Sequence, residues 1–320
     1  MKAVVAHDYG PPETYTLADI PIPVPGPGQI LVRIAAASIN PADVRLPSGD
    51  FRESFPLPFP HVPGNDFAGT VTALGPGVSA WRVGDEIFGQ AVPRAIRAMA
   101  GSSRPSLSTG SLAEYAVFEA DTPFLAHRPQ GLSVEDAAAL PTVGLTARAL
   151  MATTPVAAGE TVLVVGATGG VGTAVVPLLA SAGAKVIATA TPEDAATMLG
   201  LGAAETIAYG DYPGDVDVAM NLTLPGDELR DLAAALRAGG RLTTITFPVT
   251  QPDQLGRDDV ELTFVLDMEG TLGGMAEVAD AAARGDLKAT IGRRYGLDDG
   301  PRAVVDFARR HSTGKLVVRM

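Results

Sequence analysis

Residues 161–190 alternate between apolar, β-branched runs and a cluster of glycines. Val162–Val165 contains no polar residue, which is typical of a strand buried on both faces. A turn at Gly166–Gly172 follows, then an apolar helix-like segment at 173–182 and a second strand-like run at 186–189. Strand, turn, helix and strand within about thirty residues is the length that a βαβ unit needs.

The turn contains a variant of the GxGxxG motif, with Ala167 in the place of the first glycine. Gly169 would let backbone N–H groups approach a pyrophosphate at the positive end of the helix dipole, and Gly172 would let the helix pack closely on the strand. A turn without a ligand is the alternative, but the setting between strand and helix favours a dinucleotide. We therefore predict cofactor contacts at Gly169, Gly170 and Val171. The glycines also argue against a membrane span.

Residues 1 to 120 read as short strands separated by glycine and proline turns, a pattern that suggests a compact barrel. The expected strands are 2–6, 30–37, 68–73, 86–89 and 113–117. Residues 91–110 are small, polar and basic at Arg94, Arg97 and Arg104. We expect this segment to be a mobile surface loop that could flank a site.

From Ser133 onward the pattern changes, and helices alternate with strands, which indicates a parallel, doubly wound sheet. The expected helices are 136–140, 146–151, 194–201, 227–236, 274–284 and 301–311. The expected strands are 205–208, 216–222, 241–246 and 315–319, with a turn at Gly239-Gly240.

Composition narrows the functional class. A chain of 320 residues suggests two domains, and the net charge of −12 argues against nucleic acid or an anionic membrane as a partner. The absence of cysteine excludes disulfides, thiolate metal ligands and a cysteine nucleophile. The N-terminal Met1–Ala6 is too short and too quickly polar for a signal peptide, so we expect a cytoplasmic enzyme.

Seven short motifs occur in a characteristic order. They are INPAD at 39–43, VPGNDFAG at 62–69, WRVGD at 81–85, GSLAEY at 110–115, ALPTVGLTA at 139–147, GGVG at 169–172 and GKLVV at 314–318. Together they resemble the medium-chain dehydrogenase/reductase superfamily, in particular its zinc-independent quinone oxidoreductase (zeta-crystallin-like) branch.

The resemblance implies an α/β protein with two domains. A GroES-like, β-rich catalytic domain would span residues 1–122 and be completed by 265–320. A Rossmann domain with a doubly wound parallel sheet would span 123–264. The resemblance also implies a site in the cleft between the domains and a homodimer.

No metal site is expected. Zinc-dependent relatives place Cys and His ligands where this chain has Asn40 and Asn65, and they carry a cysteine-rich lobe that is missing here. The four histidines, at positions 7, 61, 127 and 311, show no paired spacing, although His61 would border the site. A zinc site needs at least three good ligands, and the sequence does not supply them.

Without a metal, the cofactor would carry the reaction, with NADPH giving hydride to a small hydrophobic quinone or α,β-unsaturated carbonyl. By resemblance, Asn40 and Thr146 would lie near the nicotinamide. A turn-forming Asn before proline and a Thr at a helix N-terminus are the structural alternatives. Arg45 stands where many relatives carry a substrate-binding tyrosine. It is either a group that stabilises the developing oxyanion or a solvated surface residue. Asp43 is expected to be a structural hydrogen-bond partner.

The choice between NADPH and NADH rests on the end of the second Rossmann strand. An NAD-specific domain carries an acidic residue there, whereas this chain has Ala190 and Thr191, so NADPH is favoured and NADH stays possible. Glu193 and Asp194 lie close by, but on a first helical turn they could point to solvent. The expected contacts of the cofactor beyond the glycine turn are Thr189, Thr191, Tyr209 and Phe247.

Two other functions fit the same sequence. One is a cofactor-binding redox sensor, or a partner of another protein, with little turnover. The other is an enoyl-thioester reductase, which would want basic residues such as Arg94, Arg97 and Arg104 for the phosphate of a carrier.

Overall fold

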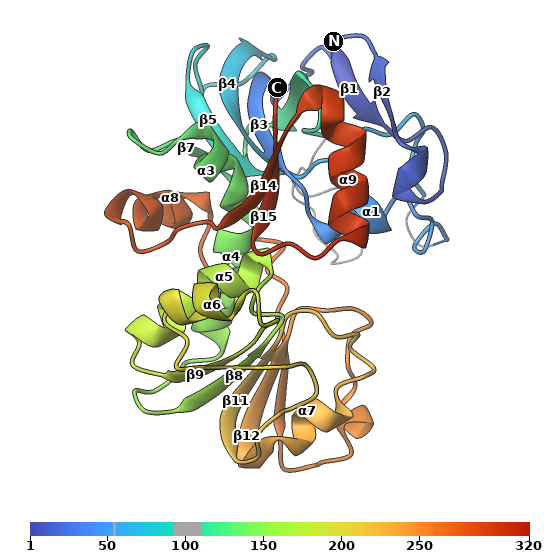
Figure 1. The fold of residues 1–320 in the computed structure, drawn as a ribbon. Helices are drawn as coiled ribbons and strands as arrows, with labels where there is room; N and C mark the ends of the chain where they lie inside the picture. Colours follow the sequence, from blue (N-terminus) through green and yellow to red (C-terminus); the bar gives the residue numbers. More distant parts are fainter. Residues whose placement is uncertain (54–55, 92–109) are drawn as a thin grey trace. The chain divides into compact units, whose positions relative to one another are not determined.

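The computed structural model describes residues 1–53, 56–91 and 110–320, which form two compact units (Figure 1). Unit 1 contains Met1–Leu145 and Met268–Met320, and unit 2 contains Thr146–Asp267. Positions 92–109 of the predicted basic loop, with Arg94, Arg97 and Arg104, lie outside the described residues.

Unit 2 is built on a six-stranded sheet in which every neighbouring pair is parallel. Its strands are β8 (Thr161–Val165), β9 (Lys185–Thr189), β10 (Glu205–Ile207), β11 (Val216–Asn221), β12 (Leu236–Thr244) and β13 (Glu261–Phe264). The spatial order β10-β9-β8-β11-β12-β13 is the 3-2-1-4-5-6 order of a Rossmann fold. The predicted doubly wound parallel sheet is therefore confirmed.

The central strand β8 has the burial that its composition predicts, since Val162–Val165 are fully buried. The helix that follows the glycine turn packs against β8 and β9. The helices in and bordering this unit are α4 (Pro141–Thr153), α5 (Gly170–Ser181), α6 (Ala195–Gly200) and α7 (Arg230–Ala234), with a short 3₁₀ turn η2 (Pro252–Leu255).

Two local predictions in unit 2 differ from the structure. Gly239-Gly240 does not form a turn but lies inside β12, and the predicted helix at 227–236 shortens to α7. The pairing of β12 with β11 shifts register between Val216 and Val218, so extra residues of β12 bulge out of the ladder. Gly239 has φ +69° in this bulge, a backbone conformation that glycine adopts readily.

Unit 1 is dominated by a seven-stranded sheet in the order β14-β15-β3-β4-β5-β7, with β6 paired to β3. Its strands are β3 (Gln29–Ser38), β4 (Asp66–Leu74), β5 (Glu86–Gln90), β6 (Tyr115–Glu119), β7 (Leu125–His127), β14 (Ile291–Gly296) and β15 (Lys315–Arg319); β1 (Lys2–Val5) and β2 (Thr16–Asp19) form a separate pair. The helical segments are α1 (Pro41–Arg45), α3 (Val134–Ala139), α8 (Met275–Arg284), α9 (Gly300–Arg309), η1 (Pro12–Thr14) and η3 (Leu297–Asp299).

The last strand of the chain completes the sheet of unit 1. β15 pairs antiparallel with β3, and Val317 lies opposite Ser38. The core beside this sheet contains Phe67 and Phe118, whose rings stack with centroids 4.0 Å apart. The pairing brings Lys315, the first residue of β15, to the end of β3.

The boundaries of the units differ from those predicted. The first lies at 145/146 instead of 122/123, because β7 pairs with β5 and α3 packs against β3 and β4. The second lies at 267/268 instead of 264/265.

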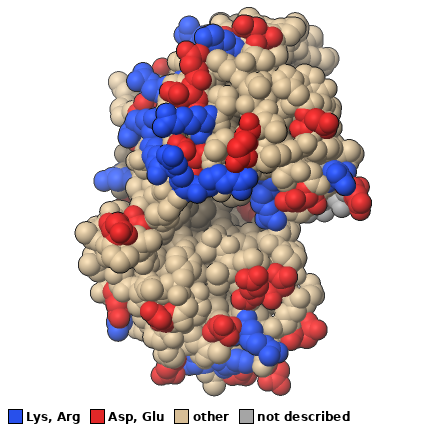
Figure 2. All heavy atoms as spheres, turned by 45° about the vertical axis from the view of Figure 1, so that its right-hand side comes forward, with Lys and Arg blue, Asp and Glu red and all other residues tan. Residues whose placement is uncertain are grey.

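Acidic and basic side chains are interleaved on the face drawn in Figure 2. On unit 1, Glu135 pairs with Arg294 at 2.8 Å and with Arg319 at 3.4 Å, and the buried Asp306 pairs with Arg310 at 3.2 Å. Ion pairs between an exposed arginine and a carboxylate contribute little to stability, so these pairs mainly neutralise local charge. None of the helices within the described ranges has the length and apolar character that a bilayer crossing requires.

Candidate active site

The glycine turn of unit 2 has the geometry of an anion-binding site. Gly169 caps α5, and Gly169, Gly170 and Val171 are all partly exposed. A Cβ on the buried Gly172 would overlap the carbonyl oxygen of Ala167, so only glycine allows this approach of helix to strand. The first N–H groups of an α-helix lack partners inside the helix and carry its positive dipole end. In this turn, these N–H groups belong to residues that are partly exposed to solvent.

Thr189 supports this turn from the neighbouring strand. Its hydroxyl accepts a hydrogen bond from the Gly166 N–H at 2.9 Å and lies 3.4 Å from the Val164 carbonyl oxygen, to which it donates. Thr189 is fully buried, and Gly166 has φ +88°. The hydroxyl that the sequence suggests as a cofactor contact is thus engaged with the backbone of the turn.

The remaining predicted contacts lie near the ends of other strands. Thr191 donates to Asp194 Oδ2 at 2.9 Å, and Asp194 is 8% exposed, so the expectation that this carboxylate points to solvent is wrong. Asp194 is the N-cap residue of α6, and its backbone N–H donates to Thr191 O at 3.1 Å. Tyr209 is exposed after β10, and the Phe247 ring meets the Phe264 ring edge-on at 5.3 Å.

Asn221 organises the next strand end, and the sequence alone does not single it out. It is fully buried at the end of β11, and its Nδ2 donates to Leu224 O, Thr244 Oγ1 and Thr246 Oγ1 at 2.9, 3.0 and 2.9 Å. Its Oδ1 accepts from Leu224 N at 2.9 Å. Ligands of open α/β sheets bind outside the carboxyl ends of the strands where the order reverses, here β8 and β11.

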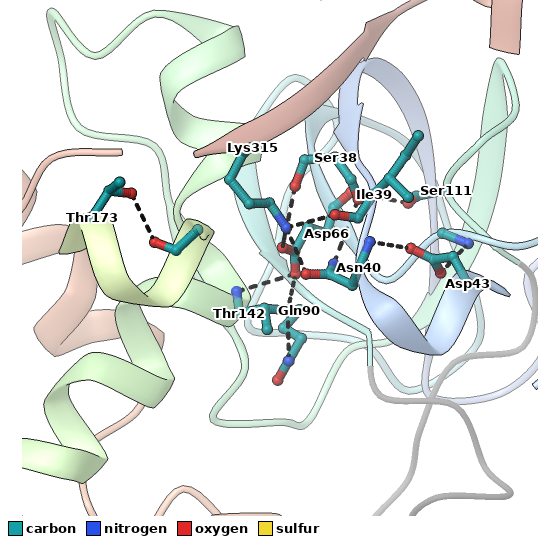
Figure 3. Close-up of polar contacts among 12 residues, drawn as sticks. Ser38, Ile39, Asn40, Asp43, Asp66, Gln90, Ser111, Thr142, Thr173 and Lys315 are labelled. Carbon is teal, nitrogen blue, oxygen red and sulfur yellow. Dashed lines mark hydrogen bonds and ion pairs between the residues drawn. The ribbon is translucent and has the colours of Figure 1, made fainter. Parts of the chain in front are cut away.

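Unit 1 contains a second, buried polar network centred on Asp66 and Lys315 (Figure 3). Lys315 Nζ donates to Ile39 O at 2.8 Å and Asn40 Oδ1 at 2.5 Å, and lies 3.4 Å from Asp66 Oδ2. Thr142 donates to Asp66 Oδ1 from its hydroxyl at 2.6 Å and from its backbone N–H at 3.1 Å.

Two further side chains complete the network. Ser38 Oγ donates to Asp66 Oδ2 at 3.2 Å, and Gln90 Nε2 donates to Thr142 Oγ1 at 2.8 Å. Asp66 is fully buried, so its charge requires partners of this kind. The network joins residues from β3, β4, β5, α4 and β15.

Asn40 and Asp43 tie α1 to this network. Asn40 precedes α1, is 4% exposed, and its N–H donates to Asp43 Oδ2 at 2.8 Å. The other oxygen of Asp43 accepts from Gly64 N at 2.8 Å. The prediction that Asp43 is a structural hydrogen-bond partner is confirmed, and the Asn before proline does stand at a helix start.

Burial shifts the titration of two of these groups. Burial raises the pKa of Asp43 to about 7, although the two N–H groups and Lys315 act in the opposite direction. Burial also lowers the pKa of Lys315, against the carboxylates of Asp66 and Asp43, which raise it.

The other two predicted residues, Arg45 and Thr146, are not among the residues that these hydrogen bonds join. Arg45 is exposed, and its Cζ lies 5.1 Å from the centroid of the Phe51 ring. Thr146 is half-buried inside α4, five residues after Pro141 begins the helix. The interpretation of Thr146 as a helix-capping residue is therefore wrong.

Comparisons with known proteins agree with this geometry. Residues 26–129 match the model of the alcohol dehydrogenase GroES-like domain, and 182–318 match that of the zinc-binding dehydrogenase family. One match thus lies in the N-terminal half of the chain and the other in the C-terminal half. The chain belongs to the medium-chain dehydrogenase/reductase superfamily.

Individual relatives of this dehydrogenase/reductase place it near the quinone oxidoreductases. The quinone oxidoreductase of Homo sapiens is 29% identical over 340 residues, covering 99% of this chain and 97% of its own. The NADPH-dependent alkenal/one oxidoreductase of Arabidopsis thaliana is 32% identical over 260 residues, and the match covers 79% of this chain but only 64% of the plant protein. The structure of the quinone oxidoreductase from Coxiella burnetii has a TM-score of 0.87 and 26% identity, covering 100% of this chain and 99% of that one.

One of the two family names refers to zinc binding, but the residues of this dehydrogenase/reductase do not suit a zinc ion. Asn40 Oδ1 and Asp66 Oδ2 converge on the ammonium of Lys315, so a side-chain cation already lies against both oxygens. Within the described ranges no three His, Cys, Asp or Glu side chains are grouped as a metal would require, and the sequence has no cysteine.

Sequence reasoning misses the buried network because its members are far apart in the chain. Lys315 and Asn40 are 275 positions apart, and Asp66 and Thr142 are 76 apart. The only available signal is that Asp66, Thr142 and Lys315 each stand inside one of the family motifs.

Proposed function

We propose that this dehydrogenase/reductase is an NADPH-dependent enzyme that transfers hydride to quinones or α,β-unsaturated carbonyls without a catalytic zinc. The observation that carries the cofactor assignment is the accessible glycine turn that opens α5 at the reversal point of a 3-2-1-4-5-6 sheet. The printed names of the human, plant and Coxiella relatives support the class of acceptor.

The residues present fit a dinucleotide. Backbone N–H groups of Gly169, Gly170 and Val171 would hold the pyrophosphate. Thr191, Tyr209 and Phe247 would contact the adenosine half, and Thr189 would act through the turn it supports. Asn40 and Thr146 would lie at the nicotinamide end. When bound, NADPH supplies the hydride.

The protein side of the reaction needs few groups. Asn40 Nδ2 is a neutral donor that can bind a carbonyl oxygen on which negative charge develops. Arg45 can add a positive charge if the acceptor lies above α1. A hydroquinone anion or an enolate is stable enough to take its proton afterwards, so no acid–base triad is required.

The proposal also includes the kind of acceptor, the oligomeric state and the cellular location of the enzyme. A small hydrophobic acceptor, a homodimer and a cytoplasmic location agree with the family resemblance. The net charge of −12 disfavours a role on nucleic acid.

The test is steady-state oxidation of NADPH with a panel of simple quinones and enones, beside a fluorescence titration of NADPH without acceptor. We expect saturable turnover with at least one acceptor, and activity that survives dialysis against a chelator. Tight NADPH binding without turnover would favour the redox sensor. Stoichiometric zinc whose removal abolishes turnover would reject the metal-free mechanism.

A further inference from the structure

Lys315 is a buried ammonium with an unusual set of partners. It is 4% exposed at the start of β15, and it donates to Ile39 O and Asn40 Oδ1 beside the carboxylate of Asp66. A buried charge is costly unless such partners satisfy it. Asp66 is held in turn by Ser38 and Thr142. The position of the ammonium is therefore fixed from several strands.

This position determines which way the Asn40 amide faces. An ammonium has three donors and no acceptor, so the atom of Asn40 that meets it at 2.5 Å must be the carbonyl oxygen. The Nδ2 group then lies at the other end of the amide. Its contact with Ser38 O is 3.5 Å, at the outer limit of a hydrogen bond. Among the described residues, this contact leaves at least one of its hydrogens available to another acceptor.

We propose that Lys315 is a positioning residue that fixes the Asn40 amide so that Nδ2 donates to a carbonyl oxygen of the reactants. This inference rests on the proposed function. The oxygen belongs to the acceptor or to the nicotinamide carboxamide, which present the same chemistry to an N–H donor. The ammonium also polarises the amide through its oxygen, which strengthens the opposite N–H as a donor.

A double-mutant cycle separates positioning from a general structural role. The variants are Lys315→Met, Asn40→Ala and the double variant, with Lys288→Met as the control, since Lys288 is an exposed lysine of unit 1. Lys315→Met should lower kcat by roughly tenfold or more in the wild-type background and by less than about twofold in the Asn40→Ala background. Equal losses in both backgrounds would overturn the proposal.

The cycle also identifies the oxygen that Asn40 binds. A loss in kcat with an unchanged NADPH dissociation constant assigns the contact to the acceptor. A matching loss in NADPH affinity assigns it to the carboxamide. If Lys315→Met does not fold, the variant Asn40→Asp tests the donor role of Asn40 instead. Its carboxylate can still accept a hydrogen bond from Lys315, but it has no N–H to donate. It should lose as much activity as Asn40→Ala, and wild-type activity would refute the proposal.

An NMR measurement tests the orientation without turnover. The chain has three asparagines, Asn40, Asn65 and Asn221, so selective ¹⁵N-asparagine labelling gives three side-chain NH₂ pairs. The Asn40 pair, assigned by its loss in Asn40→Asp, should be single and sharp in the wild type and broadened or doubled in Lys315→Met. An unchanged pair would overturn the positioning role. If the wild type shows no turnover with any acceptor, the proposed function is rejected. The NMR measurement would still test whether Lys315 orients the Asn40 amide.

Discussion

The Thr189 hydroxyl lies 2.9 Å from the backbone nitrogen of Gly166 and accepts its hydrogen bond. Thr189 is the last residue of β9, and Gly166 directly follows β8, its parallel neighbour, so a side chain of one strand shapes the loop that leaves the other. The conformation of the glycine turn therefore depends on Thr189, which lies beyond α5 in the chain.

Removing this hydroxyl should weaken cofactor binding. Thr189→Val keeps the shape of the side chain but leaves the Gly166 N–H without its partner, which typically costs about 1–3 kcal/mol for a buried group. We expect the affinities for NADPH and NADH to fall together by roughly three- to tenfold, because both share the pyrophosphate. Thr189→Ser, which keeps the hydroxyl, is the control. Unchanged affinities in fluorescence titrations of Thr189→Val would show that the turn holds its shape unaided.

Gly64, whose N–H donates to Asp43, should be costly to replace with any other residue. It has φ +114°, and a Cβ there would lie 2.5 Å from Leu112 N and Ser111 Oγ. Gly77 is the matched control, because it has φ +83° but a Cβ added to it would meet nothing within 4 Å. Gly77→Ala should cost only the backbone strain, about 1–2 kcal/mol, and Gly64→Ala at least about 2 kcal/mol more.

Denaturant unfolding followed by the fluorescence of Trp81 measures both glycine variants. Trp81 is the single tryptophan and is buried in unit 1, where its Nε1 donates to Ala120 O at 3.0 Å. Equal losses of unfolding free energy in the two variants would mean that the loop around Gly64 can move away from an added methyl group.

Asp43 should make the stability of the protein depend on pH. Its pKa is raised from 3.8 to about 7, so between these values the folded protein keeps a proton that the unfolded chain has lost. The contribution of Asp43 is fully present below about pH 4 and is lost as the pH rises to 7. The slope is at most about 1.4 kcal/mol for each pH unit.

The variant Asp43→Asn isolates this contribution, since the amide does not titrate. The unfolding free energy of the wild type minus that of the variant should fall by a few kcal/mol between pH 4 and pH 7.5, as measured by urea unfolding. Two curves that stay parallel over this range would mean that the N–H groups of Asn40 and Gly64 keep Asp43 ionised throughout.

Local pattern is sufficient for the parallel sheet but not for the polar networks. The strand, glycine turn and helix at 162–182 are encoded by neighbouring residues, and burial of Val162–Val165 follows from their composition. The contact between Lys315 and Asn40 depends instead on the pairing of β15 with β3, which no periodicity specifies.

Two differences between pattern and structure have the same physical origin. The sequence suggests Thr189 as a direct ligand because it ends a strand, whereas its engagement with Gly166 depends on the register of β9 against β8. Gly239-Gly240 suggests a turn because adjacent glycines allow one, but the two residues lie in the bulged part of β12, between Leu236, which pairs with Val216, and Arg241, which pairs with Val218.

Arg45 stays a prediction that kinetics can decide. It is exposed on α1 with its guanidinium over Phe51, a position open to a substrate as well as to solvent. Arg45→Ala should lower kcat for the acceptor several-fold and leave NADPH affinity unchanged, because a charge near the developing oxyanion acts mainly in the transition state. Arg52→Ala, at another exposed arginine seven positions along, is the control. Equal kcat for both variants would assign Arg45 to the surface.

Asp194 should limit how strongly the protein prefers NADPH. Its carboxylate accepts from the Thr191 hydroxyl at 2.9 Å and is 8% exposed, just beyond β9 where the ribose of a dinucleotide is expected. A negative charge there repels a 2′-phosphate and competes with it for the Thr191 hydroxyl. The strand end itself carries no acid, and no Lys or Arg occurs between Lys185 and Arg230, so the wild-type preference should be modest, about tenfold or 1.4 kcal/mol.

Asp194→Asn should therefore tighten NADPH by roughly three- to tenfold and change NADH little, while Glu193→Gln, at an exposed neighbour, should change neither. Fluorescence titration of both reduced cofactors against the three proteins measures this. A variant that loses NADH affinity instead would mean that Asp194 holds the ribose 2′-hydroxyl, as the acidic residue of an NAD-specific domain does. Equal wild-type affinities, or tighter NADH, would show that the missing lysine and arginine outweigh the missing acid at the strand end.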